Sequence, residues 1–250
     1  MKRRTSPVAF ARDGHLASIT LDLMASGGRF TPESAVAFSE ACGRCDEDDV
    51  WVVWLRSVGR DFSLGIQGRL QDWPRVAGID FVAALAAVRQ PVVASIRGRA
   101  EAEGFELALA ADLRVVGRRT TLVMPQVGRG AIPTFGGTQR LPRIVGAERA
   151  LRVLLLGEAI DGRKAVDWGL AARSAERVDT AAERMVAELL ERGPVALRFA
   201  KEAVRRSLDL ALDDGARFEH DLYVLLETTK DRAEGVKAFL AKRKPVFRGS

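Results

Sequence analysis

Apolar and polar residues alternate near the start of the chain and then give way to short runs that are apolar throughout. Residues 16–23 (LASITLDL) place alternate apolar side chains on one face, which predicts a strand buried on one side. Residues 50–55 (VWVVWL) and 91–96 (PVVASI) are short and almost wholly apolar, as is typical of strands covered on both faces. Helical segments separate these strands, so the pattern predicts a layered α/β core with repeated crossovers.

The first helix has a clear beginning in the sequence. Thr31 is suited to cap the helix, Pro32 to occupy its first position, and Glu33 to face the positive end of the helix dipole. We expect this helix to run to about Cys45. The other elements predicted in this half are helices at 79–89 and 106–111 and a strand at 113–116.

After about Leu141 every signal is helical. Asp161 and Asp179 are expected to cap helices, and Gly169 and Gly193 to end them. We divide the chain into an α/β core, residues 1–193, and a C-terminal helical oligomerisation region, residues 194–250. The latter contains amphipathic segments at 195–207, 215–229 and 232–243. Fifty residues of helix cannot easily bury their own apolar face, so this region is expected to pack on the core or on a neighbouring subunit.

Composition limits the classes of function. Among 250 residues, 47% are hydrophobic and 29% charged, which supports a sizeable core and excludes general disorder. No run of about 18 uncharged apolar residues occurs, so no membrane partner is expected. The basic start lacks the apolar segment of a signal peptide, and we expect a cytoplasmic protein. The net charge of +6 suits a phosphate-bearing ligand or a nucleic acid, but aromatic residues are only 6%, which disfavours a base-stacking platform.

Several kinds of catalytic site lack the residues they need. Cys42 and Cys45 form a single C-x-x-C, and the only histidines are His15 and His220, so no metal site is expected. Nucleophilic catalysis by serine or cysteine lacks a neighbouring base. The glycine patterns of phosphate-binding loops and dinucleotide folds are also missing. Carboxylates and backbone amides remain as candidate catalytic groups.

Two segments share one arrangement, a buried strand followed by a tight turn of small residues. Residues 61–69 (DFSLGIQGR) follow the first apolar strand, and residues 98–106 (GRAEAEGFE) follow the second. Such turns leave backbone N–H groups unpaired, and two of these groups can converge on a developing oxyanion.

These turns and the segments that follow them resemble the enoyl-CoA hydratase/isomerase (crotonase) superfamily over about residues 16–248. The matching segments are DFSLGIQGR, GRAEAEGFELALAADLRVV, MPQVGRGAIPTFGGTQRLPRIVG, LLLGEAIDGRKAVDWGLA and EGVKAFLAKRKPVFRG. The resemblance implies an α/β fold of the ClpP/crotonase-like class, built of repeated ββα units with a C-terminal helical trimerisation region. It also implies a homotrimer or a dimer of trimers.

The family binds acyl-CoA thioesters and polarises the thioester carbonyl with two backbone amides. Carried over to this sequence, those amides belong to Ile66 and Glu103, and coenzyme A is part of the substrate rather than a separate cofactor. Arg29 lies near a family position that can approach coenzyme A. The other positions implied in substrate or coenzyme A binding are Ser63, Leu64, Gly65, Gln67 and Arg69, with Phe239 and Lys242 reaching the adenine end from an adjacent subunit.

Hydratases of the family usually hold one water between two glutamates. Glu106 matches the first position, but the second is Gln126, and an amide cannot donate or accept a proton as an acid or base. Glu103 replaces a usual glycine, and we hypothesise that it substitutes for the missing carboxylate; the alternative is a solvated acid in the first turn of a helix. Glu101 is expected to be a solvated surface residue.

The sequence therefore predicts an enoyl-CoA hydratase that adds water to a trans-2-enoyl-CoA, with Glu106 as the general base. One alternative is a double-bond isomerase, which needs only one carboxylate to move a proton between carbons. Hydration of a dienoyl or alicyclic acyl-CoA is another. An RNA-binding homologue of the family is a remote alternative that the basic charge permits.

Overall fold

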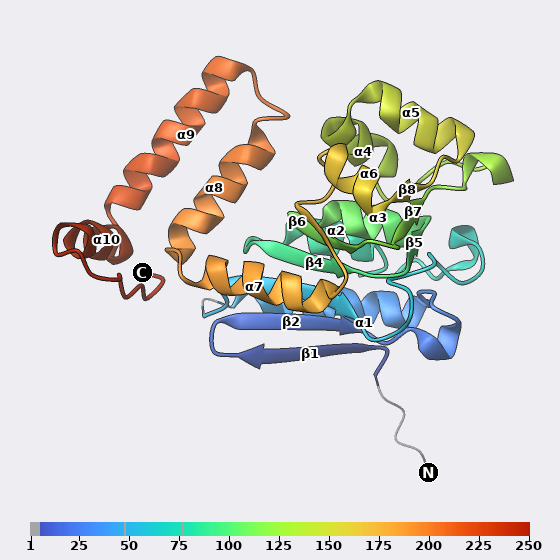
Figure 1. The fold of residues 1–250 in the computed structure, drawn as a ribbon, viewed down its shortest axis with the longest axis horizontal. Helices are drawn as coiled ribbons and strands as arrows, with labels where there is room; N and C mark the ends of the chain where they lie inside the picture. Colours follow the sequence, from blue (N-terminus) through green and yellow to red (C-terminus); the bar gives the residue numbers. More distant parts are fainter. Residues whose placement is uncertain (1–5, 48, 77) are drawn as a thin grey trace, which may run out of the picture.

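The structure is a computed structural model that describes residues 6–47, 49–76 and 78–250 (Figure 1). Its main sheet has six strands, of which β1 and β2 are antiparallel and the others parallel. In spatial order the strands are β1 (Val8–Asp13), β2 (Leu16–Leu21), β3 (Val52–Ser57), β4 (Val92–Ile96), β6 (Leu113–Gly117) and β9 (Arg173–Ala175).

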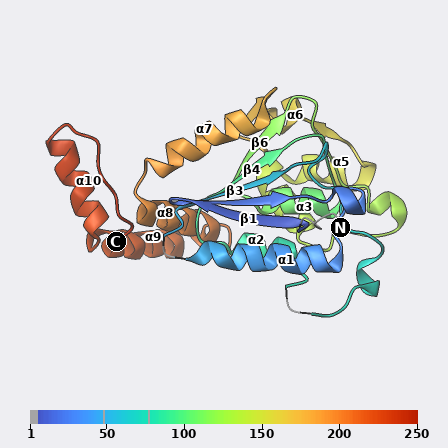
Figure 2. The ribbon, with the colours of Figure 1, turned by 90° about the horizontal axis from the view of Figure 1, so that it is seen from below.

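Helices cover both faces of this sheet. The first face carries α1 (Pro32–Gly43), α2 (Phe81–Ala87) and α3 (Glu103–Ala110), and the opposite face carries α7 (Val178–Leu190), as Figure 2 shows. The central strands are apolar on both sides for this reason. In β3, Val53 and Leu55 join the core beneath α1 to α3, whereas Val52 and Trp54 join the core beneath α7.

A second, smaller sheet begins with the short strand that leads the chain from β4 to α3. It consists of β5 (Arg99–Glu101), β7 (Thr121–Val123) and β8 (Ile160–Asp161), with β5 parallel to β7 and β8 antiparallel to β7. Above it lie α4 (Gly137–Val145), α5 (Ala147–Leu156) and α6 (Gly162–Asp167). This sheet and α4 enclose the beginning of α3, where the candidate site lies.

The last three helices extend away from the core at one end of the molecule (Figure 1). They are α8 (Pro194–Arg206), α9 (Leu212–Glu227) and α10 (Lys230–Leu240). Asp112, just before β6, ties α8 to the core through Lys201 (2.6 Å) and Arg205 (3.1 Å). Large apolar side chains remain exposed on these helices and the turn between α8 and α9, among them Val204, Leu208, Leu212, Tyr223, Leu225, Phe239 and Leu240.

The structure confirms the long elements predicted from sequence and corrects several short ones. Thr31 caps α1 and Asp161 caps α6, as predicted. Asp179 does not cap α7, because that helix starts at Val178, and Gly193 caps the beginning of α8 rather than ending α7. The second half is also not purely helical, since it contains β8 and β9. Strands of two or three residues are too short to show a period, which is why the sequence does not indicate them.

The division expected at residues 193 and 194 falls between α7 and α8. None of the helices in the described ranges combines the length and apolarity that crossing a membrane requires.

Candidate active site

The turn after β3 lies between two segments that hold its backbone. On one side, the Glu101 N–H donates to the Ser63 carbonyl oxygen at 2.9 Å. On the other side, the Phe30 N–H donates to the Gly65 carbonyl oxygen at 2.8 Å. The next amide, that of Ile66, has no backbone acceptor among the described residues. The Ile66 N–H is therefore available to a side chain or a ligand.

Helix α3 begins beside this turn. Ala102, the residue before the helix, has a φ of 52°, a left-handed value that residues with a side chain rarely adopt. The helix starts at Glu103, three residues earlier than the sequence pattern indicates. The N–H of a first helical residue has no acceptor within its own helix. The Glu103 amide is thus a second donor at the same place in the fold.

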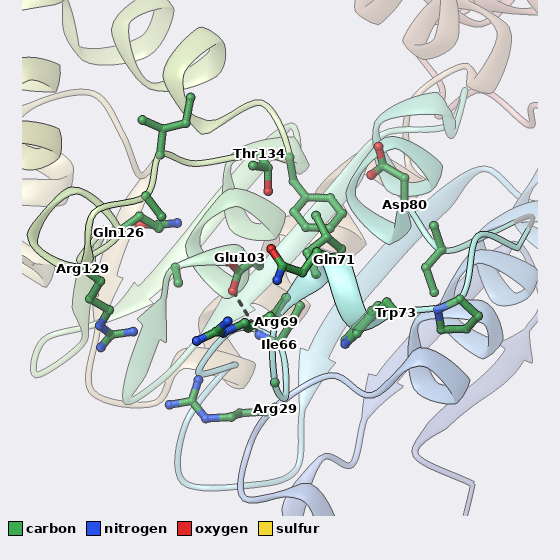
Figure 3. A pocket seen from close by; sticks show the side chains of 18 of the residues that line it. Arg29, Ile66, Arg69, Gln71, Trp73, Asp80, Glu103, Gln126, Arg129 and Thr134 are labelled. Carbon is green, nitrogen blue, oxygen red and sulfur yellow. Dashed lines mark hydrogen bonds between the residues drawn. The ribbon is translucent and has the colours of Figure 1, made fainter.

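The side chain of Glu103 turns back onto the neighbouring turn. Its Oε2 accepts a hydrogen bond from the Ile66 N–H at 3.0 Å, drawn as the dashed line in Figure 3. The side chain is half-buried. Glu103 is therefore not the free, solvated acid that was one of the two expectations for it.

Glu106 lies three residues further along α3 and is fully buried. Its Oε1 accepts hydrogen bonds from the Phe135 and Gly137 N–H groups, both at 2.8 Å. Its Oε2 accepts a long hydrogen bond, 3.5 Å, from Nε2 of Gln126. Two fixed backbone donors thus orient the carboxylate, and its other oxygen faces Gln126.

Burial raises the pKa of Glu106 from its ordinary value of 4.5 to about 7. The hydrogen bonds from Gly137 and Phe135 act in the opposite direction, and the negative charge of Glu103 adds to the rise. A carboxylate that titrates near neutral pH can both accept and return a proton under physiological conditions.

Gln126 lies between Glu106 and a cavity in the molecule. It directly precedes a 3₁₀ turn, Val127–Arg129, and its side chain lines the cavity described below. Its Oε1 is buried and has no hydrogen-bond partner among the described residues. A buried acceptor without a partner is costly, so this oxygen is suited to receive a hydrogen bond from a bound water or ligand.

A cavity of about 1070 Å³ adjoins these groups (Figure 3). Ile66, Glu103 and Gln126 all line it. The remaining wall is partly apolar and partly cationic; it includes Arg29, Arg69, Leu70, Gln71, Trp73, Arg75, Ile79, Asp80, Arg129, Ile132, Thr134 and Phe135. The cavity is large enough for a small-molecule ligand, and its guanidinium groups favour an anionic one.

Glu101 differs from the sequence expectation. It is 4% exposed rather than solvated, and it pairs with Arg99 at 2.6 Å and with Arg129 at 2.9 Å. Because Arg129 lies 28 positions away in the sequence, no local pattern indicates this pairing. The ion pairs bring a basic side chain to the edge of the cavity.

The other residues predicted to bind substrate occupy different places. Arg69 lines the cavity and is exposed, and Arg29 lines it while donating to the Leu64 carbonyl oxygen. Ser63 and Gly65 are buried in the turn, and neither they nor Leu64 and Gln67 line the cavity. Phe239 lies on α10 and Lys242 just after it, at the opposite end of the molecule from the site in this single chain (Figure 1).

Sequence reasoning missed the groups that hold Glu106. The donors are backbone N–H groups of Phe135 and Gly137, so their side-chain chemistry gives no indication of the role. The available signal is the glycine-rich stretch that ends in Gly136 and Gly137, in which the backbone can approach the carboxylate closely.

Cys42 and Cys45 are free, buried thiols. Burial raises the pKa of both, for Cys45 to about 12, so neither has the thiolate character of a reactive cysteine.

Comparisons with known proteins place this geometry in a family. The sequence profile of the enoyl-CoA hydratase/isomerase family matches residues 15–250. The 2,3-dehydroadipyl-CoA hydratase of Escherichia coli is 38% identical over 169 residues, which cover 67% of this chain and 66% of that protein. The matches span just under two thirds of the length of the first curated relatives, 65% and 66%.

Solved structures extend the likeness to nearly the whole chain. An enoyl-CoA hydratase from Bacillus anthracis is 27% identical with a TM-score of 0.91, covering 98% of this chain and 100% of that one. An enoyl-CoA hydratase from Mycobacterium tuberculosis has the same TM-score and coverage at 25% identity. The expected crotonase fold is thus confirmed, and the chain belongs to the enoyl-CoA hydratase/isomerase family.

Proposed function

We propose that this protein is an acyl-CoA enzyme that adds water to a trans-2-enoyl-CoA. The observation that carries the proposal is Glu106, a buried carboxylate with a pKa of about 7, in contact with Gln126 on the cavity wall. The amides of Ile66 and Glu103 at the same cavity are the candidate donors for the thioester oxygen. The E. coli relative, a 2,3-dehydroadipyl-CoA hydratase, supports the same class of reaction.

In the proposed reaction Glu106 removes a proton from water while the water oxygen attacks C3 of the enoyl thioester. The double-bond electrons move toward the thioester oxygen, which accepts hydrogen bonds from the Ile66 and Glu103 N–H groups. Protonated Glu106 then returns its proton to C2, so that one water is added and the carboxylate is regenerated. Each amide donor of this kind contributes about 3 kcal/mol to transition-state stabilisation.

Gln126 has an orienting part in this proposal. Its unpartnered Oε1 accepts a hydrogen bond from the attacking water, but its amide cannot take or give the proton. That Glu103 replaces the second carboxylate stays a hypothesis, because in this structure the Glu103 side chain accepts a hydrogen bond from the Ile66 N–H.

The same glutamine favours a second candidate, a double-bond isomerase. Glu106 alone can take a proton from one carbon and return it to another, with no second acid. Hydration of a dienoyl or alicyclic acyl-CoA is a further variant. The Gln126→Glu variant tests whether the missing second carboxylate limits the hydration rate. If it does, the variant hydrates faster than wild type. If it does not, the hydration rate is unchanged.

We propose that Arg69 binds phosphate groups of coenzyme A and that no separate cofactor takes part. Phe239 is 82% exposed, and we assign it and Lys242 to the coenzyme A of a partner subunit.

A homotrimer or dimer of trimers would cover the exposed apolar side chains of α8 to α10. Light scattering on the purified protein measures the mass of the assembly, and a monomer at working concentration would contradict the proposed trimer. The free thiols fit a cytoplasmic location.

The decisive experiment mixes purified protein with short and medium trans-2-enoyl-CoA esters and follows the absorbance of the conjugated thioester. We expect rapid loss of absorbance, abolished in Glu106→Gln. Binding of the esters without loss of absorbance would overturn the hydratase proposal and favour the isomerase and dienoyl alternatives.

A further inference from the structure

The structure places a carboxylate of the protein at the position that the proposed function reserves for the substrate. Oε2 of Glu103 lies 3.0 Å from the Ile66 amide nitrogen and accepts its hydrogen bond. That N–H is the donor to which a thioester oxygen would bind. A carboxylate oxygen resembles an enolate oxygen in charge and in its acceptor geometry, so the two are competitors for the same donor.

The local backbone accommodates this carboxylate closely. Gly65 has a φ of 91°, and a Cβ at this position would collide with Glu103 Oε2. The absence of a side chain at Gly65 therefore provides the space that the carboxylate fills. On the other side, the left-handed turn at Ala102 makes Glu103 the first residue of α3, and the Glu103 side chain reaches the Ile66 N–H.

The cavity also offers the carboxylate an alternative position. Arg69 lines the same space with a guanidinium that has no hydrogen-bond or ion-pair partner among the described residues, whereas Arg29 already donates to the Leu64 carbonyl oxygen and Arg129 already pairs with Glu101 (Figure 3). A Glu103 carboxylate displaced from the Ile66 N–H would therefore have a guanidinium on the same cavity wall to pair with. Displacement by a ligand costs the hydrogen bond to Ile66 but does not require a free charge in an apolar site.

We propose that Glu103 is a displaceable internal ligand of the anion site, which must leave the Ile66 N–H before an acyl thioester can bind there. This inference rests on the proposed function, because it takes the thioester oxygen as the competitor. Glu103 then has two opposite effects on one site. Its backbone N–H supplies one donor, and its side chain occupies the other until the substrate arrives.

The test measures binding by titration calorimetry with two unreactive probes. Butyryl-CoA carries the thioester oxygen, and S-butyl-CoA, its thioether analogue, lacks that oxygen but keeps the chain and the phosphates. In Glu103→Ala we expect the preference for butyryl-CoA over S-butyl-CoA to rise about tenfold, close to the lower limit for a hydrogen bond to a charged group. Glu103→Gln keeps an acceptor for Ile66 and should give a smaller rise.

Asp80→Asn is the matched control. Asp80 is another acid on the cavity wall, and its Oδ1 caps α2 by accepting the Ala83 N–H at 2.8 Å, which an asparagine also does. Loss of this charge should change the affinity for both probes by the same factor, since it acts only through the anionic phosphates.

The outcomes separate the inference from the proposed function. If wild type and variants bind neither probe, the acyl-CoA function fails and the inference fails with it. If both probes bind but Glu103→Ala leaves their ratio unchanged, or lowers it, the function stands and the internal ligand is refuted.

Discussion

Helix α3 carries two glutamates close to the cavity, and the fold holds their carboxylates in opposite ways. Glu106 is fully buried behind Gln126, and two backbone N–H groups bind one of its oxygens. On the wall formed by the turn after β3, Glu103 is half-buried and holds a single N–H that a ligand would also use. The two residues are less than one helical turn apart.

The comparison shows that partners, not residue type, decide what a carboxylate can do. The backbone donors of Glu106 cannot move away, so its position is constant and only its proton can exchange. Its desolvation raises the pKa to about 7, which suits proton transfer. Glu103 has a replaceable partner, so its position can change when a ligand binds.

The largest effect is expected for Glu106→Gln. This variant keeps an acceptor for the Phe135 and Gly137 donors but removes the exchangeable proton, so we expect about a 10³-fold loss of hydration rate. The loss is measured by following the absorbance of the conjugated enoyl thioester. Circular dichroism on the same sample checks the fold, and a folded variant that keeps more than a tenth of the activity would refute Glu106 as the base.

Glu106 should also make stability depend on pH. Its pKa is about 7 in the folded protein and near 4.5 when unfolded, so the folded state binds the proton more tightly. The stabilisation is complete below about pH 4.5 and is lost as the pH rises through 7. The difference corresponds to about 3 kcal/mol.

Glu106→Gln removes this titration. We therefore expect the variant to gain stability relative to wild type between pH 4.5 and pH 8, as measured by urea unfolding at several pH values. A difference in unfolding free energy that stays constant over this range would contradict the raised pKa.

A smaller effect is expected when the wall behind Glu106 is disturbed. A Cβ at Gly137 would lie 3.0 Å from Oε1 of Glu106 and 3.0 Å from Cε of Met124. Gly137→Ala should therefore lower activity roughly tenfold and stability by about 1–2 kcal/mol, because the carboxylate must shift. Gly128→Ala is the control, since nothing lies within 4 Å of a Cβ there. Equal losses in both variants would argue against a specific contact with Glu106.

The smallest effect concerns Glu101, a third carboxylate near the same cavity. Arg129→Ala leaves it paired with Arg99, and both arginines are largely exposed, so we expect a loss of less than about 1 kcal/mol in unfolding free energy. Replacing both arginines leaves a buried charge without a partner and should cost more than the sum of the single changes. Strictly additive losses of unfolding free energy in the double-mutant cycle would show that buried Glu101 does not depend on its two arginine partners.

Much of the fold could be predicted from the sequence because its signals are local. The cap at Thr31 and the apolar runs of β3 and β4 depend on neighbouring residues, and the structure confirms them. The short strands β8 and β9 could not be predicted in this way, because each is defined by its pairing with a distant strand.

For the candidate site, the sequence alone determined which residue types were present: the glutamates at 103 and 106, a glutamine at 126, and glycine-rich turns after two buried strands. Only the tertiary structure decided their states. Burial beneath α4 and backbone donors from a distant segment set the pKa of Glu106, and the approach of the turn after β3 gave Glu103 its partner at Ile66. Desolvation and hydrogen bonding depend on groups that are far apart in the chain and adjacent only after folding, so no local pattern encodes them.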